Sequence, residues 1–265
     1  MKFSNLLVLS TAACLPGASA HYTFWSLVIN QNVTGIGEYV RTPDRDRKSL
    51  WRYPAYLANG TLALACNTDT FASAPNTSIA TVTAGLDLLG FQSASKKGKY
   101  GSLRPYPVWH PGPLGIYLSK SETPDVRDYD GSGKWFKIYE LGWNASVPEG
   151  PVPYGDPVRW FAEETNTSSL LHFPIPPTTP PGQYLLRIEH IFPQTTVESM
   201  QLYISCAQIE VQGPGGGTPG PLVQISDYLN VENQDLAVSQ EMEWDYKVDP
   251  GYKIPGPKVW TGESD

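Results

Sequence analysis

The sequence predicts an all-β protein, an immunoglobulin- or fibronectin-like antiparallel β-sandwich with long loops and little helix. Two observations lead to this prediction. The 25 prolines and 24 glycines are scattered along the 265 residues, and the apolar segments between them are short. No segment keeps a helical spacing of apolar residues beyond a turn or two, whereas short runs rich in β-branched and aromatic residues recur between turn residues. Such a pattern is typical of a sandwich.

Seven segments are expected to be strands, and they follow here in chain order. The first, residues 21–30, is rich in aromatic and β-branched residues. The second, residues 78–85, alternates threonine with alanine and valine, as a half-buried strand should. The other five are residues 114–120, 134–141, 170–175, 182–192 and 199–211.

The glycine- and proline-rich stretch from Gly213 to Pro221 resembles a linker between domains. The part that follows it, residues 222–265, is small for an independent module and has no disulfide of its own. We therefore expect residues 222–265 to be a long C-terminal loop and tail packed on the sandwich, and residues 21–265 to form a single domain.

The first twenty residues have the layout of a secretory signal peptide. Lys2 is followed by the apolar run "LLVLSTAACL" and by the small residues Ala18, Ser19 and Ala20, which form an Ala-x-Ala cleavage site. The apolar run is too short to cross a bilayer. Cleavage after Ala20 would make His21 the first residue of a secreted, extracellular protein.

Sequons and cysteines agree with export. Five Asn-x-Ser/Thr sequons are candidate glycosylation sites, at Asn32, Asn59, Asn76, Asn144 and Asn166. Two cysteines, Cys66 and Cys206, remain after Cys14 leaves with the signal peptide, and in an oxidising compartment they most simply form one disulfide. Closing a loop of that length would stabilise the fold by on the order of 4 to 5 kcal/mol in the chain-entropy treatment.

The charge of the chain narrows the range of partners. A formal net charge of −7 argues against nucleic acid and anionic membranes. No second long apolar segment is present, so we expect a soluble protein, and a monomer. A neutral polymer remains a possible substrate.

A metal site is suggested by the N-terminal histidine. A free His21 would offer both its imidazole and its α-amino group, which deprotonates readily for a metal. One further imidazole would complete a three-nitrogen, T-shaped set that favours Cu(II). His110 lies in a Pro/Gly loop just before a strand and is a plausible second ligand, whereas His172 and His190 lie inside strand-like runs, where packing or hydrogen bonding is the commoner role.

Several ordered motifs resemble those of the fungal lytic polysaccharide monooxygenases of auxiliary activity family nine. Besides an N-terminal histidine, the resemblance rests on "RTP" at Arg41, "LACN" at Leu64, His-x-Gly-Pro at His110, "WFKIYELG" at Trp135, "PPGQYLLRIE" at Pro180, "QLYISCAQIEV" at Gln201 and "YKIPGP" at Tyr252. It covers most of the chain after residue 20. It implies one copper ion held by the amine and imidazole of His21 and by the imidazole of His110.

The resemblance also implies further site residues. Tyr203 would be the axial ligand, Gln201 would lie behind it, Cys66 and Cys206 would form the disulfide common in the family, and Tyr228 would offer a surface tyrosine to the substrate. Strand geometry is compatible, because Gln201 and Tyr203 are two residues apart and share a face, while Cys206 points to the other.

One position departs from the family pattern. Members typically carry a histidine seven residues after the arginine that matches Arg187, and here that position is Gln194. Glutamine can donate a hydrogen bond but cannot supply a proton as imidazolium, so the catalytic role expected at Gln194 would be altered. His190 has the same strand parity and could compensate, although the displacement is about 13 Å along an extended strand.

The resemblance implies an oxidative activity. With copper, an external electron donor and peroxide or dioxygen, such an enzyme cleaves cellulose or a related β-glucan after oxidation at C1 and/or C4. No pair of carboxylates stands out of the kind that a hydrolase needs. The alternative is a non-oxidative or weakly active copper-binding relative that acts in copper handling or at the cell surface, and Gln194 keeps this alternative open. A sugar-binding sandwich without metal is disfavoured by His21 and His110.

Overall fold

A computed structural model describes residues 21–43, 54–96, 103–108, 110–142, 169–244 and 251–263. The proposed signal peptide, residues 1–20, and the sequons at Asn144 and Asn166 lie outside these ranges. Asn32, Asn59 and Asn76 lie within them, and each is exposed.

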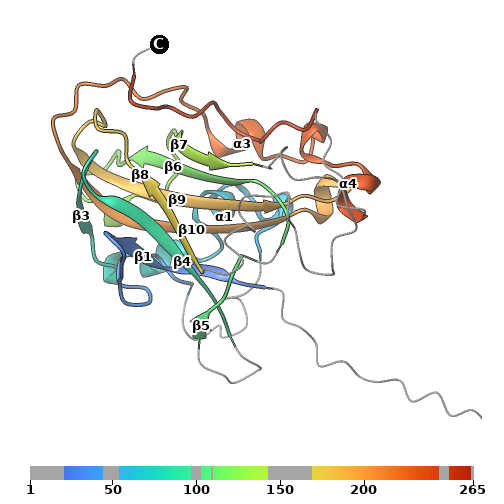
Figure 1. Ribbon diagram of the computed structural model, residues 1–265, viewed down its shortest axis with the longest axis horizontal. Helices are drawn as coiled ribbons and strands as arrows, with labels where there is room; N and C mark the ends of the chain where they lie inside the picture. The colour runs from blue at the N-terminus through green and yellow to red at the C-terminus, as the bar shows by residue number, and fades with distance from the viewer. Residues whose placement is uncertain are drawn as a thin grey trace, which may run out of the picture.

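Two sheets form the sandwich, which confirms the predicted fold class (Figure 1). One sheet has the order β2-β1-β4-β5, and β8 also pairs with β4; its strands are β1 (Thr23–Ile29), β2 (Asn32–Val33), β4 (Leu88–Lys96), β5 (Leu103–Pro105) and β8 (Leu170–Pro174). The other has the order β3-β10-β9-β6-β7, with β3 (Ala80–Thr83), β6 (Leu114–Lys120), β7 (Phe136–Leu141), β9 (Gly182–Phe192) and β10 (Gln201–Gln212). Among these ten strands the pairings are antiparallel except that of β3 with β10.

The helices among the described residues are short, as predicted. The α-helices are α1 (Thr61–Cys66), α3 (Ile225–Tyr228) and α4 (Gln240–Trp244). The 3-10 helices are η2 (Leu57–Asn59), η3 (Thr70–Asn76), η4 (Val126–Asp128), η6 (Val197–Ser199) and η7 (Gln234–Leu236). They lie between strands or in the segment after β10.

The seven expected strands correspond to β1, β3, β6, β7, β8, β9 and β10, whereas β4 and the short strands β2 and β5 were missed. Gly90 interrupts the apolar run of β4 in the sequence and weakens its strand signal. In the structure this glycine is required, because a Cβ at position 90 would lie 2.2 Å from the Leu171 carbonyl oxygen of β8. The close approach of the β4 and β8 backbones therefore explains why position 90 is glycine, the residue that weakened the strand prediction.

Side chains of both sheets form the main core between the layers, with Leu27, Phe91, Ile116, Ile188 and Ile209 fully buried. A second apolar cluster lies on the outer face of the β9/β10 sheet. It is formed by residues of α1, of α3 and of both strands, including Leu64, Leu185, Leu202, Ile204 and Ile225. The disulfide between Cys66 and Cys206, which the sequence predicted, joins α1 to β10 in this second cluster.

The C-terminal segment runs past β7, the edge strand of the β3-β10-β9-β6-β7 sheet (Figure 1). Val223 forms a β-bridge with Trp135, and Val259 forms one with Lys137 of β7. The Trp260 ring packs edge to face on Phe136 at 5.5 Å. The described part of residues 222–265 therefore packs against the same sheet that carries β9 and β10.

Candidate metal centre

His21 immediately precedes Tyr22 and β1. Its carbonyl oxygen accepts a hydrogen bond from the Ser95 hydroxyl of β4 at 2.8 Å. Because β1 is an inner strand of its sheet, its pairing with β4 fixes where residue 21 lies at one end of the sandwich. The His21 side chain is half-buried.

His110 is presented by the loop that leads into β6, and the His-x-Gly-Pro motif explains how. Gly112 has φ of +143°, and a Cβ there would lie 1.8 Å from the Ile191 carbonyl oxygen of β9. Only glycine permits this approach. The Ile191 N–H then donates to the Pro113 carbonyl oxygen at 3.0 Å, which fastens the loop to β9.

The two histidines converge across the end of the sandwich. The ring centroids of His21 and His110 are 6.3 Å apart, with an angle of 79° between the ring planes. Phe192, the last residue of β9, stacks on the His110 ring at 4.3 Å with nearly parallel planes. No sequence motif indicates this role for Phe192, because a phenylalanine that ends a strand is normally a packing residue.

Tyr203 and Gln201 of β10 lie beside these histidines. The Tyr203 ring is 6.4 Å from His21 and 5.5 Å from His110, between centroids. Its hydroxyl donates to Gln201 Oε1 at 2.7 Å, as expected of two residues on one face of a strand. Burial, with a smaller effect of nearby Tyr56, raises the pKa of Tyr203 well above its usual value, so this phenol stays protonated.

The residues at this end of the sandwich fit a copper ion. Within the described ranges, no group of three or more His, Cys, Asp and Glu side chains could hold a metal. The donors that converge here are instead two imidazoles and a phenol, and a chain that begins at His21 adds its amine. Three nitrogen donors with one weaker oxygen suit Cu(II) better than they suit the hard cations.

Gln194 lies just beyond the end of β9, and its side chain bonds to the neighbouring backbone. Its side-chain Nε2 donates to the Pro193 carbonyl oxygen at 2.9 Å, and its main-chain carbonyl oxygen accepts from the Val238 N–H at 3.0 Å. Within the described part of the chain, no hydrogen bond joins its side chain to Gln201 or Tyr203.

His190 lies behind the site rather than at the place of Gln194. It is fully buried, it pairs with Tyr203 across β9 and β10, and a hydrogen bond joins its Nδ1 to the hydroxyl of Tyr22. Burial, with a smaller effect of nearby His110, lowers the pKa of His190 to about 3, so the ring is neutral near pH 7. The structure places His190 against Tyr22, not against Gln201, which argues against the compensating role considered from the sequence.

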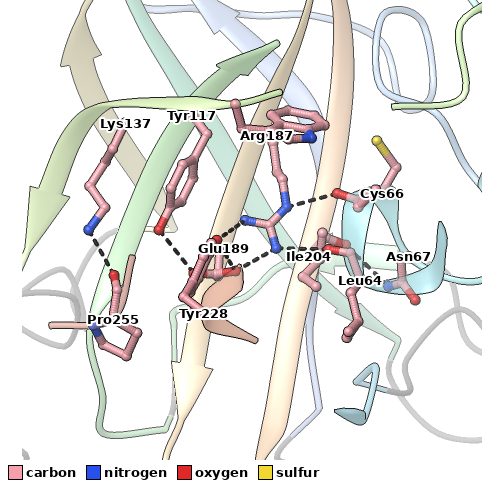
Figure 2. Close-up of polar contacts among 12 residues, drawn as sticks. Leu64, Cys66, Asn67, Tyr117, Lys137, Arg187, Glu189, Ile204, Tyr228 and Pro255 are labelled. Carbon is pink, nitrogen blue, oxygen red and sulfur yellow. Dashed lines mark hydrogen bonds and ion pairs between the residues drawn. The ribbon is translucent and has the colours of Figure 1, made fainter. Parts of the chain in front are cut away.

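The expected surface position of Tyr228 is wrong. This residue of α3 is only 8% exposed and stacks on Tyr117 at 6.0 Å. Its hydroxyl donates to a Glu189 carboxylate oxygen at 3.2 Å, inside a buried network that also includes Arg187 (Figure 2). Burial raises the pKa of Tyr228 well above its usual value. The segment after Gly213 folds back so that α3 faces the second apolar cluster, and the tyrosine is therefore structural.

We expect Tyr228→Phe to lower stability without changing polysaccharide binding. The substitution keeps the ring stack and removes one donor from the buried Glu189 carboxylate, which should cost about 1 to 2 kcal/mol of unfolding free energy. Urea denaturation measures the loss, and pull-down on insoluble glucan measures the binding. Weaker binding at unchanged stability would restore Tyr228 to the substrate surface.

The fold and the site together define a class of protein, a β-sandwich with two histidines and a tyrosine converging at one end. The sequence model of Auxiliary Activity family 9 (formerly GH61) matches residues 21–247. The chain belongs to this family, and it is accordingly a copper-dependent polysaccharide monooxygenase, an oxidoreductase. The family resemblance predicted from the sequence motifs is confirmed.

Curated relatives support the same assignment. AA9 family lytic polysaccharide monooxygenase G of Aspergillus tamarii is 36% identical over 99% of this chain and 72% of its own length. AA9 family lytic polysaccharide monooxygenase U of Thermothielavioides terrestris is 34% identical over 95% of this chain and 96% of its own length. Enzymes of this family take a polysaccharide substrate, an external reductant and an oxygen species.

Solved structures share the fold. CvAA9A superposes with a TM-score of 0.69 at 24% identity, over 92% of this chain and 100% of its own. A cellulose-active polysaccharide monooxygenase from M. thermophila superposes with a TM-score of 0.67 at 25% identity, over the same shares. In the described ranges of the present chain, none of the helices has the length and apolar character needed to span a bilayer.

Proposed function

We propose that the mature chain is secreted, begins at His21 and binds one copper ion through the His21 amine and imidazole and the His110 imidazole. The observation that carries this proposal is the near-perpendicular approach of the two histidine rings beside Tyr203. The match to the family also starts at residue 21. We further propose that the protein acts as a monomer.

Each residue has a distinct part in this site. The His21 amine and imidazole and the His110 imidazole would hold the ion, and the Tyr203 hydroxyl would be a further, weaker oxygen donor. Gln201 accepts the Tyr203 hydroxyl hydrogen and so fixes where that oxygen points. Phe192 covers one face of the His110 ring and limits its rotation. When bound, copper supplies the redox chemistry, with electrons from an external donor and peroxide or dioxygen as the oxidant.

We propose cellulose or a related β-glucan as the substrate, with oxidation at C1 and/or C4 beside the glycosidic bond. The cellulose-active M. thermophila enzyme, which shares the fold, supports this choice. With Tyr228 buried, contacts to the glucan must come from other residues around His21 and His110. Oxidation of a C–H bond needs no carboxylate pair across the substrate, unlike hydrolysis.

The deciding experiment combines intact mass spectrometry, copper titration and product analysis. We expect a mature N-terminus at His21, and oxidised oligosaccharides when the copper-loaded protein is incubated with cellulose, a reductant and peroxide. Aldonic products would indicate oxidation at C1, and C4-oxidised products would indicate the other position. A mature chain that begins before His21 would overturn the proposed site.

We expect His110→Ala to weaken copper binding by more than about 100-fold and to abolish the oxidised products. The loss should exceed that of changes outside the ligand sphere, which typically cost 10- to 100-fold. His172→Ala is the matched control, because His172 lies in β8 and pairs with Gly90 of β4. This control should bind copper as the wild type does. Equal losses in both variants would mean that the titration does not report on a site at His110.

Gln194 favours a second candidate function, a copper-binding relative without substantial oxidative activity. The amide is held by the Pro193 carbonyl, and glutamine cannot donate a proton as imidazolium does. The same experiment separates the two functions. Tight copper binding without oxidised products, and with products gained by Gln194→His, would support the second function.

A further inference from the structure

Tyr22 occupies an unusual place beside the site. It directly follows His21, is 1% exposed, and stacks face to face on Tyr203 with 4.4 Å between ring centroids and 12° between ring planes. Because Tyr22 immediately precedes β1, the stack joins the start of that strand to β10 of the other sheet. The residue next to one metal-binding histidine thus fixes the ring of the tyrosine beside the proposed copper ion.

His190 completes this arrangement from β9. Its ring centroid lies 5.9 Å from that of Tyr22 and 6.0 Å from that of Tyr203, and its Nδ1 shares a hydrogen bond with the Tyr22 hydroxyl. Because His190 is the direct antiparallel partner of Tyr203, the hydrogen bond ties Tyr22 to the strand that neighbours β10. Three elements, β1, β9 and β10, are therefore connected just behind His21.

A polar pair at this position needs an explanation other than packing. The surrounding cluster is apolar, and a buried hydroxyl or imidazole costs free energy unless it is hydrogen-bonded. Two apolar side chains would fill the space without that cost. The hydrogen bond between Tyr22 and His190 instead fixes an orientation: it sets the rotation of the Tyr22 ring and hence the plane on which Tyr203 stacks.

We propose that Tyr22 and His190 are a positioning pair, which holds His21 and Tyr203 in the arrangement that binds copper. The inference rests on the proposed function, because it assigns these residues to the same metal centre. Tyr22 acts on His21 through the chain and on Tyr203 through the ring stack. His190 acts on both through the Tyr22 hydroxyl.

The test compares copper binding and the Cu(II) electron paramagnetic resonance spectrum in Tyr22→Phe, His190→Leu and His190→Asn. Tyr22→Phe keeps the ring and loses the hydroxyl, while His190→Leu removes the ring nitrogens. We expect both variants to bind copper about tenfold more weakly, the low end for residues that orient ligands, and to change the copper hyperfine coupling. Asparagine offers a polar atom near the Nδ1 position, so His190→Asn should recover part of the affinity that His190→Leu loses.

Tyr184→Phe is the matched control. Tyr184 is equally buried, and its hydroxyl donates to the Pro180 carbonyl oxygen at 2.7 Å, but it lies near the start of β9, far along the strand from His190. The variant should lose stability much as Tyr22→Phe does, yet keep the wild-type spectrum and affinity. This comparison separates a general loss of packing from a change at the metal.

Unchanged spectra and affinities in folded Tyr22→Phe and His190→Leu would overturn the positioning role. If either single variant does not fold, Tyr22→Phe combined with His190→Leu avoids a lone buried polar group, and the same two measurements decide. If His110→Ala binds copper as tightly as the wild type does, the proposed metal site itself is overturned. If the wild type binds copper through His110 but the Tyr22 and His190 variants keep its affinity and spectrum, only the positioning role is overturned.

Discussion

Replacing Arg187 with methionine should lower the unfolding free energy by about 3 to 5 kcal/mol, the usual cost of leaving one partner of a buried ion pair alone. Arg187 is fully buried and Glu189 is 1% exposed. Although burial opposes its charged form, the Glu189 carboxylate holds the pKa of Arg187 above its usual value. Without the guanidinium, the carboxylate would remain buried, and its hydrogen-bonding side chains among the described residues would be Tyr117 and Tyr228.

Arg187 also fastens α1 to β9, which adds to the expected loss. Its Nε donates to the Ala65 carbonyl oxygen at 2.8 Å, and its Nη2 donates to that of Leu64 at 2.9 Å (Figure 2). These carbonyls belong to the last turn of a short helix, where backbone acceptors have no helical partner. Removal of the arginine therefore leaves a carboxylate and two carbonyls to be satisfied in other ways.

Urea denaturation of three variants tests this account. Arg187→Met combined with Glu189→Leu should be more stable than Arg187→Met alone, because the unpaired charge is gone. Arg127→Met is the matched control, since Arg127 pairs with Asp125 at the surface, and its denaturation midpoint should stay close to that of the wild type. A loss below about 1 kcal/mol in Arg187→Met would contradict this structural role of Arg187.

Removing the Cys66–Cys206 disulfide should destabilise the protein by about 5 kcal/mol in the chain-entropy treatment. The two cysteines are 140 residues apart, so the cross-link removes a large loop from the unfolded ensemble. Cys66→Ala combined with Cys206→Ala is the suitable change, because both positions are buried and a serine would add a buried hydroxyl.

The prediction extends to the metal centre. Cys206 belongs to the outer apolar cluster of its sheet, whereas Tyr203 belongs to the core between the sheets. The folded double variant should therefore bind copper with nearly wild-type affinity at 25 °C while unfolding at much lower urea concentration. Copper affinity that falls in parallel with stability would show that the disulfide also shapes the site.

Local patterns in the sequence predicted much of the fold. Alternation and turn residues located seven strands, and strand parity placed Gln201 and Tyr203 on one face with Cys206 on the other. The His-x-Gly-Pro motif identified His110, and the structure brings it to His21. These inferences depend on residues close together in the chain, where periodicity is informative.

The features that sequence reasoning missed depend on contacts between distant segments. The pairing of His190 with Tyr203 requires the register of β9 on β10, which no local pattern specifies. The burial of Tyr228 requires the path of the C-terminal segment over the sheet, and the resemblance to the family suggested the opposite. In the sequence, Gly90 argued against a strand, whereas in the structure it permits the close approach of β4 to the Leu171 carbonyl oxygen of β8.

The separation of the two cysteines also has a consequence for biosynthesis. A ribosome adds about 5 to 20 residues per second, so Cys206 would emerge roughly 7 to 28 s after Cys66. If the chain is secreted as proposed, Cys66 would be a free thiol in an oxidising compartment during that interval, and Cys14, in the proposed signal peptide, is the cysteine that precedes it in the sequence. Prompt removal of the leader would thus free the new histidine terminus and also discard the one wrong partner available to Cys66 within its own chain.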